Sequence, residues 1–185
     1  MKIGITGSLA SGKSSVARIL SKNTNLLFSA DKIVKNLYSN NKFKSKIMKK
    51  YKIERKDIKG EIKRKLLKKE ISLNELGKII HPFVRKQMKN FHKKNKNKKI
   101  IFFEIPLLVE SKLMKFFNSI ILVVAPRKDR LKRYLKNGGK KNMFDLLDQN
   151  QMYYKKKIKY CDYLIVNNKS KNILKRKVSD IIKNV

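Results

Sequence analysis

The sequence predicts an α/β fold in which a parallel sheet is flanked by helices. Short apolar runs, typical of buried strands, alternate with helical patterns along the 185 residues. The first run leads into a glycine-rich turn and then a helix, which is the order found in phosphate-binding βα units. No internal repeat and no linker divides the chain, so we expect a single domain over residues 1–185.

The first half of the chain contains two expected strands and a mainly helical region. The strands are expected at Lys2–Thr6 and Leu26–Ser29, which are short and apolar. A helix begins near Asp31, and apolar residues at spacings of three and four predict short helices over 42–70. The same spacing predicts a longer helix over Leu73–Phe91.

The second half repeats the alternation of strands and helices. Ile100–Phe103 is apolar at every position, and we expect it to be the central strand. The remaining elements are expected, in order, as a strand at Ile120–Val124, a helix at Arg127–Lys136, a basic turn at Asn137–Lys141, a helix at about Asn142–Lys157, a strand at Tyr163–Val166 and a closing helix over Ile173–Ile182.

The turn after the first strand fits the phosphate-binding pattern of Gly, four residues, then Gly-Lys-Ser. Its glycines allow backbone N–H groups to form a concave anion site, and the next helix adds its positive end. Lys13 can reach the β- and γ-phosphates, and the Ser14 hydroxyl can ligate Mg²⁺. A chance match on an ordinary loop is disfavoured by the placement between strand and helix. The expected phosphate-binding residues are Gly7, Leu9, Ala10, Ser11, Gly12, Lys13, Ser14 and Ser15.

The composition indicates a protein that folds around a core and acts in the cytoplasm. Hydrophobic residues make up 41% of the chain, yet no apolar stretch is long enough to span a membrane. The first residues lack the sustained apolar region of a secretory signal. Cys161 is the only cysteine, which excludes an internal disulfide and agrees with a reducing compartment.

The net charge of +36 has two interpretations. A charge of this size can serve a nucleic-acid partner, which is bound through its phosphates. It can also reflect compositional drift, because Lys, Asn and Ile are abundant throughout. We favour drift, since the lysines are spread over the whole length, and we expect no specific nucleic-acid partner. The positive field should still attract a polyanionic substrate.

Two acidic residues follow expected strands, where ligands bind in open α/β sheets. Asp31 can orient an attacking hydroxyl, accept its proton or hold the water shell of a metal. It can equally be the N-cap of the following helix. Glu104 can support a metal ion or the acceptor without binding it directly, or it can be the start of a helix. The residues alone leave both choices open.

Three arginines and a histidine are weaker candidates. Arg127, Arg130 and Arg133 can stabilise a transferring phosphoryl group. In so basic a chain, however, each of them is more simply explained as part of a solvent-exposed basic helix face. Arg133 stands out because the Gly138-Gly139 turn nearby can act as a lid. His81 is more typical of a structural histidine, and the proline after it should kink or restart the longer helix.

Four blocks of the chain stand out in this order: Ile5–Ala17, Ser29–Ile33, His81-Pro82 and Pro106–Glu110. A weaker match follows at Gln151, Lys157, Asp162 and Asn167-Asn168. Together they resemble the dephospho-CoA kinase family. The resemblance implies a P-loop kinase-type fold, a parallel sheet flanked by helices with a helical acceptor-binding insertion and a short lid. It implies transfer of phosphate from ATP, with Mg²⁺, to the ribose 3′-hydroxyl of dephospho-coenzyme A, the final step of coenzyme A synthesis.

The resemblance also implies roles for individual positions. Asp31 orients or deprotonates the hydroxyl, with Lys13 and Arg133 as further catalytic residues. Residues 40–95 close over the acceptor, and residues 137–147 form the lid over ATP. The remaining site residues are Asn167 near the adenine, and His81, Pro106, Leu107, Leu108 and Glu110 with Asp31 at the substrate.

The chain departs from the family pattern at several positions. Ser8 and Ala10 stand where the family usually has Gly, which we expect to be tolerated if their φ angles are negative. Ser29 replaces the first Asp of an Asp-Ala-Asp block. Leu147 and Asn137 replace arginines, and Lys140 or Lys141 is the expected substitute in the lid.

Two other functions compete with this one. The first is a related small-molecule kinase of the same fold, acting on a nucleoside or on adenylate. The second is a basic nucleic-acid-binding protein in which the phosphate-binding loop is vestigial. The sequence leaves the oligomeric state open.

Overall fold

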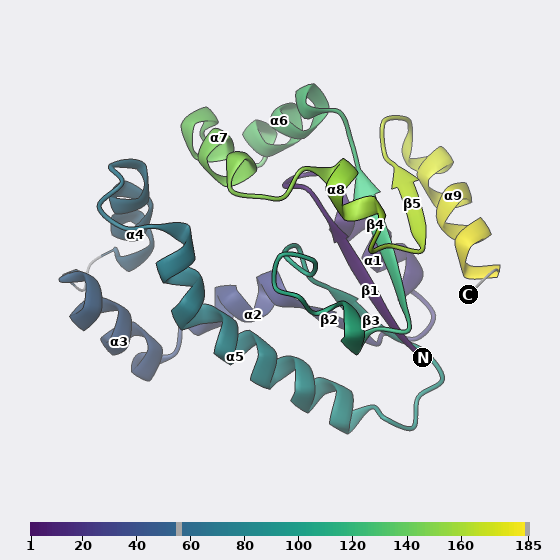
Figure 1. The fold of residues 1–185 in the computed structure, drawn as a ribbon, viewed down its shortest axis with the longest axis horizontal. Coiled ribbons are helices and arrows are strands. Elements are labelled where there is room, and N and C mark those ends of the chain that lie inside the picture. The colour runs from purple at the N-terminus through teal and green to yellow at the C-terminus, as the bar shows by residue number, and fades with distance from the viewer. Residues whose placement is uncertain (55–56, 184–185) are drawn as a thin grey trace. The chain divides into compact units, whose positions relative to one another are not determined.

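The computed structural model describes residues 1–54 and 57–183, which form two compact units. The first unit is built from residues 1–29 together with the chain from His92 onward. The second unit is Ala30–Phe91. Figure 1 shows the elements along the chain. Within the described residues, every helix is too short or too polar to cross a lipid bilayer.

The first unit is organised around a five-stranded parallel sheet in the order β2-β3-β1-β4-β5. This confirms the α/β fold. The central strand is β1, so the expectation that the apolar run after residue 99 is central was wrong. That run is β3, which is buried throughout because it lies between β1 and β2. The strands are β1 (Lys2–Gly7), β2 (Leu27–Ser29), β3 (Ile101–Glu104), β4 (Ser119–Val124) and β5 (Tyr163–Val166).

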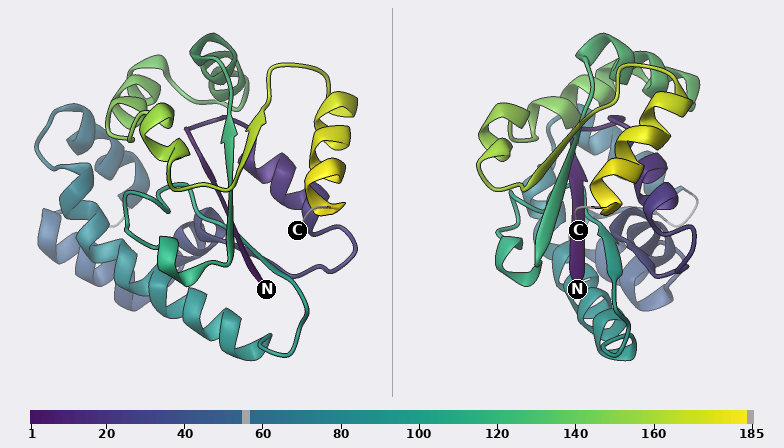
Figure 2. Two further views of the ribbon diagram at one scale, coloured as in Figure 1. Left: turned by 45° about the vertical axis from the view of Figure 1, so that its right-hand side comes forward. Right: turned by 90° about the vertical axis from the view of Figure 1, so that its right-hand side faces the viewer.

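Helices α1 (Lys13–Leu20) and α9 (Lys171–Lys183) lie side by side against one face of the sheet (Figure 2). Their apolar faces pack on alternate strand residues, as the period of two in a strand requires. The cluster comprises Ile3, Ile5, Val16, Ala17, Leu20, Phe102, Ile121, Val123, Ile165, Leu174 and Val178.

The opposite face is covered by the segment that follows β3. A Cβ at Gly4 would lie 2.6 Å from Leu108 Cδ1, so this segment packs directly against the backbone of β1. The segment contains the short 3₁₀ helix η1 (Met114–Phe116), and Phe116 packs edge-on against Phe103 with ring centroids 5.6 Å apart.

Three helices follow β4, namely α6 (Arg127–Lys136), α7 (Lys141–Gln149) and α8 (Tyr154–Ile158). The prediction of one continuous helix over Asn142–Lys157 was wrong. The helix ends at Gln149, and the Asn150 side chain donates to the carbonyl of Leu146 at 2.8 Å. Because the helix ends there, Gln151 can contact Leu9 in the glycine-rich loop, and Met152 can contact Glu110 in the segment after β3.

The second unit contains α2 (Ala30–Leu37), α3 (Asn41–Tyr51), α4 (Ile58–Leu67) and most of α5 (Leu73–Lys94). The helices predicted over 42–70 are confirmed. The N-terminus of α5 carries a capping box, in which Ser72 Oγ accepts from the Glu75 N–H and Glu75 Oε2 accepts from the Ser72 N–H. A kink or a restart was predicted at Pro82, and the restart was wrong, because the helix continues through this residue.

Candidate active site

The carboxyl ends of the parallel strands bring four segments to one edge of the sheet. Ile5 pairs with Glu104, Gly7 pairs with Val123, and Val124 pairs with Val166. The glycine-rich loop, Glu104, the start of α6 and the Asn167 turn therefore meet at this edge. Ligands bind at this edge in open α/β sheets.

The two glycines of the loop are required by its backbone geometry. Gly7 has φ +148°, and a Cβ there would lie 2.1 Å from the carbonyl oxygen of Val123. Gly12 has φ +99°, and a Cβ there would lie 2.1 Å from Nδ2 of Asn167. The loop thus passes so close to β4 and to Asn167 that a side chain at either position would displace it.

Ala10 lies in the left-handed region with φ +56°. The condition of a negative φ is therefore not met at Ala10, whereas Ser8 is not among the described residues with positive φ. A non-glycine residue in this conformation costs about 1–2 kcal/mol, because its Cβ approaches the following carbonyl. The loop therefore holds local strain that its surroundings must offset.

Lys13 and Ser14 place the polar groups of the motif at the start of α1. Lys13 is 6% exposed, and its ammonium donates to the carbonyl of Ser8 at 2.8 Å. The Ser14 hydroxyl donates to Oε1 of Glu104 at 2.5 Å. Glu104 is 3% exposed and ends β3 without starting a helix, so the alternative of a helix start was wrong.

The Ser14 hydroxyl and the Glu104 carboxylate form a donor set that fits Mg²⁺. This ion prefers oxygen ligands, retains several waters and binds through one or two carboxylates plus substrate phosphates. Among the residues that the structure describes, no group of three His, Cys, Asp or Glu side chains could hold a metal ion. A metal here would therefore depend on phosphate oxygens and water for the rest of its shell.

Arg133 and Asn167 both contact the carbonyl of Ser11 in the loop. Arg133 donates to it at 3.3 Å and to the carbonyl of Asn167 at 2.9 Å, while Asn167 Nδ2 donates to Ser11 at 2.8 Å. A cavity of about 530 Å³ opens beside them, lined in part by Gly12, Arg133, Asn167 and Lys169. Its size suits a small organic ligand. Both predicted residues are thus brought to the loop.

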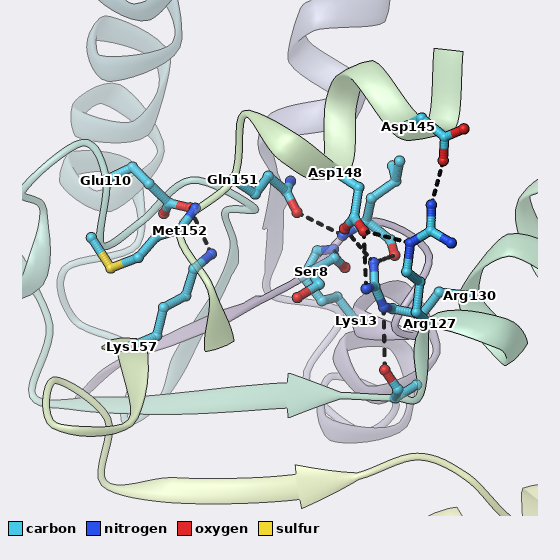
Figure 3. Close-up of polar contacts among 12 residues, drawn as sticks. Ser8, Lys13, Glu110, Arg127, Arg130, Asp145, Asp148, Gln151, Met152 and Lys157 are labelled. Carbon is cyan, nitrogen blue, oxygen red and sulfur yellow. Dashed lines mark hydrogen bonds and ion pairs between the residues drawn. The ribbon is translucent and has the colours of Figure 1, made fainter. Parts of the chain in front are cut away.

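Arg130 was expected on a solvated basic face, which was wrong, since only 8% of it is exposed. It makes a bidentate ion pair with Asp148, with Nη–Oδ distances of 2.5 and 3.2 Å. Figure 3 shows Arg130, Asp148 and Gln151 converging beside Ser8 and Lys13. Arg127 remains largely exposed and pairs with Asp145.

Sequence reasoning named Arg130 and Gln151 but missed Asp148 and the contacts among them, because no spacing rule links residues that only the fold brings together.

The segment after β3 is fixed to the rest of the unit by polar contacts. Thr6 Oγ1 donates to the carbonyl of Pro106 at 3.0 Å, and Leu108 is fully buried. Glu110 Oε1 forms an ion pair with Lys157 at 2.7 Å and accepts from the Met152 N–H at 3.1 Å. Within the described part of the chain, no hydrogen bond reaches the buried Oε2 of Glu110.

The turn between α6 and α7 is built on two glycines. Gly138 has φ +80°, and a Cβ at Gly139 would lie 2.1 Å from the Tyr134 ring. Tyr134 packs on Phe144 with ring centroids 5.6 Å apart, and burial raises the pKa of its hydroxyl. Tyr134 therefore stays neutral and anchors the expected lid by apolar contact.

Asp31 and His81 belong to the second unit. Asp31 is exposed in the first turn of α2, which begins at Ala30, so the alternative that Asp31 is the N-cap was wrong. His81 is half-buried on α5, and burial together with the nearby charge of Arg85 lowers its pKa. His81 is therefore mainly neutral at pH 7.

Known proteins match both the sequence and the fold. A model of the dephospho-CoA kinase family matches residues 1–172. The chain is 33% identical to the dephospho-CoA kinase of Fusobacterium nucleatum, over 96% of this chain and 95% of that protein. Its structure resembles dephospho-CoA kinase from Campylobacter jejuni, with a TM-score of 0.67 and 25% identity over 100% of this chain and 97% of that one.

A Thermus thermophilus structure shares the fold, with a TM-score of 0.77 and 23% identity over 100% of this chain and 97% of that chain. The match of the family model over nearly the whole sequence, on a fold that carries the glycine-rich loop, shows that this chain belongs to the dephospho-CoA kinase family.

Proposed function

We propose that the protein transfers the γ-phosphoryl group of ATP to the ribose 3′-hydroxyl of dephospho-coenzyme A, giving coenzyme A. The observation that carries this proposal is the loop itself. Its glycines hold a tight backbone turn, Lys13 is buried against it, and Ser14 contacts a buried carboxylate at the edge of the sheet. In a member of this family, such a loop fits the triphosphate of ATP.

On the donor side, the loop N–H groups and the start of α1 would bind the β- and γ-phosphates, and Lys13 would turn from Ser8 toward them. The cavity beside Gly12 and Asn167 would take the nucleoside. Arg133 lies at the loop and would stabilise the charge that develops on the transferring group. Support for this assignment comes from the contacts of Arg133 and Asn167 with Ser11.

The donor set of Ser14 and Glu104 supports magnesium as the metal. When bound, Mg²⁺ neutralises part of the negative charge of the phosphates. The Ser14 hydroxyl would be a ligand, and Glu104 would accept hydrogen bonds from Ser14 or from a water of the metal. Because Glu104 is almost fully buried, its charge acts in a medium that screens it less than water does.

On the acceptor side, we propose Asp31 as the residue that orients or deprotonates the ribose hydroxyl. The support is its position in the chain, two residues after the end of β2, and its match to the family block. Pro106, Leu107 and Glu110 are partly exposed and are proposed to contact the substrate, with Leu108 packed beneath them. His81 completes the proposed set as a neutral side chain.

We assign the net charge of +36 to compositional drift and to attraction of an anionic substrate, not to a specific nucleic-acid partner. We place the reaction in the cytoplasm, where ATP is abundant. A free cysteine, Cys161, is compatible with that compartment.

The test is a phosphoryl-transfer assay with ATP, Mg²⁺ and a panel of acceptors. We expect turnover on dephospho-coenzyme A to exceed turnover on adenylate and nucleosides by at least about a hundredfold in kcat/KM, because only the intended acceptor uses its full binding energy. Equal turnover on adenylate or a nucleoside would instead favour the related-kinase alternative. Salt-sensitive nucleic-acid binding without any transfer would favour the binding protein.

A further inference from the structure

Both backbone groups of Leu9, in the middle of the phosphate-binding loop, are bound by side chains from distant parts of the chain. The Leu9 N–H donates to Gln151 Oε1 at 2.8 Å, and the Leu9 carbonyl accepts from Arg130 Nη1 at 3.3 Å. These partners lie 142 and 121 residues away in sequence. Neither belongs to the glycine-rich motif, so the loop is held from outside as well as by its own glycines.

The Arg130 side chain is itself held in place. Besides its two bonds to Asp148, its Nε donates to the carbonyl of Ala125 at 3.2 Å. A buried guanidinium with a carboxylate on one edge and carbonyls on the other has little freedom to move. Arg130 therefore presents a fixed donor to Leu9.

Gln151 is fixed through the residue that follows it. The Met152 N–H donates to Glu110, and that carboxylate is paired with the fully buried Lys157. The left part of Figure 3 shows Met152 and Lys157 meeting Glu110. The backbone beside Gln151 is thus tied to the segment after β3, and its side chain amide is aimed at Leu9.

Ala10, the residue after Leu9, has a strained backbone conformation that such contacts can stabilise. Ala10 has φ +56°, a conformation that glycine adopts freely and alanine adopts only when its surroundings impose it. Leu9 is joined directly to Ala10, so fixing both backbone groups of Leu9 restricts the rotation that would relieve the strain.

We propose that Gln151 and Arg130 are positioning residues that hold Leu9, and through it Ala10, in the backbone shape that binds the phosphates of ATP. The inference rests on the proposed function, because the anion to be bound is the nucleotide. The Leu9 N–H is already used by Gln151, so Leu9 serves through the shape of the loop. Arg130 lies on α6 and Gln151 just after α7, and these elements thereby set nucleotide affinity without touching the nucleotide.

The experiment measures the Kd of ATP by calorimetry, and kcat and KM by the transfer assay, on the full chain. Gln151→Leu keeps the size of the side chain but removes the acceptor. We expect it to weaken ATP binding by roughly tenfold, the effect of one lost hydrogen bond, while kcat at saturating ATP stays within about threefold. Gln149→Leu is the matched control, since Gln149 is exposed, and should leave the Kd unchanged.

A second comparison separates positioning from a general structural role. In the Ala10→Gly background the loop no longer depends on external support, so Gln151→Leu should change the Kd by less than about threefold. Should Gln151→Leu fail to fold, Gln151→Asn keeps the amide but is one methylene too short, and the same two results are expected of it.

The outcomes are distinct. If the unaltered protein does not bind ATP, the proposed function fails. If it binds ATP but Gln151→Leu matches Gln149→Leu, or if Ala10→Gly gives no rescue, the positioning role is overturned.

Discussion

The ammonium of Lys157 lies 2.7 Å from Oε1 of Glu110, and no part of the Lys157 residue is exposed to solvent. The pair connects α8 to the Pro-Leu-Leu-Val-Glu block that follows β3. Glu110 is also the acceptor for the Met152 N–H, so one carboxylate oxygen joins two segments of the chain. Removing one partner of a buried ion pair destabilises the folded protein, because the other charge stays buried without a countercharge.

Lys157→Met should therefore lower the free energy of unfolding by about 3 kcal/mol, because it leaves the partly buried Glu110 carboxylate without its countercharge. Adding Glu110→Gln removes that charge while keeping an acceptor for Met152, and should restore most of the loss. Denaturant unfolding of both variants tests this. Lys156→Met, at an exposed neighbour, should change stability by less than about 0.5 kcal/mol. Additive effects of the two substitutions would contradict the pairing.

Lys13→Ala should lower kcat/KM for phosphoryl transfer by about a hundredfold to a thousandfold, because it removes the cation nearest the proposed phosphate site. The same variant should bind nucleic acid almost as the unaltered protein does, since it removes one of 49 basic side chains. Lys22→Ala, at an exposed position, serves as the charge-matched control. An unchanged transfer rate in Lys13→Ala would remove the basis for the kinase assignment.

Ala10→Gly should stabilise the protein, which is unusual for a glycine substitution. Alanine in the left-handed region costs about 1–2 kcal/mol, and the added freedom of glycine in the unfolded chain costs about 0.5–1 kcal/mol, so a net gain of about 0.5–1 kcal/mol is expected. Ala10→Val should instead destabilise, because a β-branched residue tolerates φ +56° poorly. Thermal unfolding of the two variants provides the measurement, and a loss of stability in Ala10→Gly would show that the loop is not strained.

Much of the fold and part of the site could be predicted because their signals are local. The loop motif is contiguous, and the carboxyl end of β3 is marked by a charge after an apolar run, which pointed to Glu104. The rest depends on tertiary structure. Arg130 and Asp148 are 18 residues apart, and Gln151 is 142 residues from Leu9, so only the fold brings them together.

The errors have physical causes of the same kind. Burial is nearly equal for β3 and its neighbour β1, so apolar content could not identify the central strand. The amphipathic pattern of α7 ends at Gln149, where tertiary contacts of Gln151 and Met152 compete with continued helix.

Glu104→Gln should raise the Mg²⁺ concentration needed for half-maximal activity by roughly tenfold, since it removes a buried negative charge while keeping an acceptor for the Ser14 hydroxyl. Glu61→Gln removes the same charge from an exposed side chain of α4 and should leave the magnesium requirement unchanged. Titration of activity with Mg²⁺ at fixed ATP makes the measurement. Equal requirements in the two variants would mean that Glu104 does not act through the metal.

Cys161 should react slowly with thiol reagents at neutral pH. Burial, reinforced by the charge of Asp162, raises the pKa of its thiol to about 11 from an ordinary value near 9. As the pH rises, the folded protein therefore keeps this proton to a higher pH than the unfolded chain does. The resulting stabilisation is present in full below pH 9 and is lost as the pH rises toward 11.

Modification kinetics across pH 7–11 test this, with the urea-unfolded protein as the control. We expect the native rate at pH 8 to be at least about tenfold below the unfolded rate, because thiolate is the reactive form. Similar rates in both states at pH 8 would show that the thiol has an ordinary pKa, and the loss of stability above pH 9 would then need another titrating group.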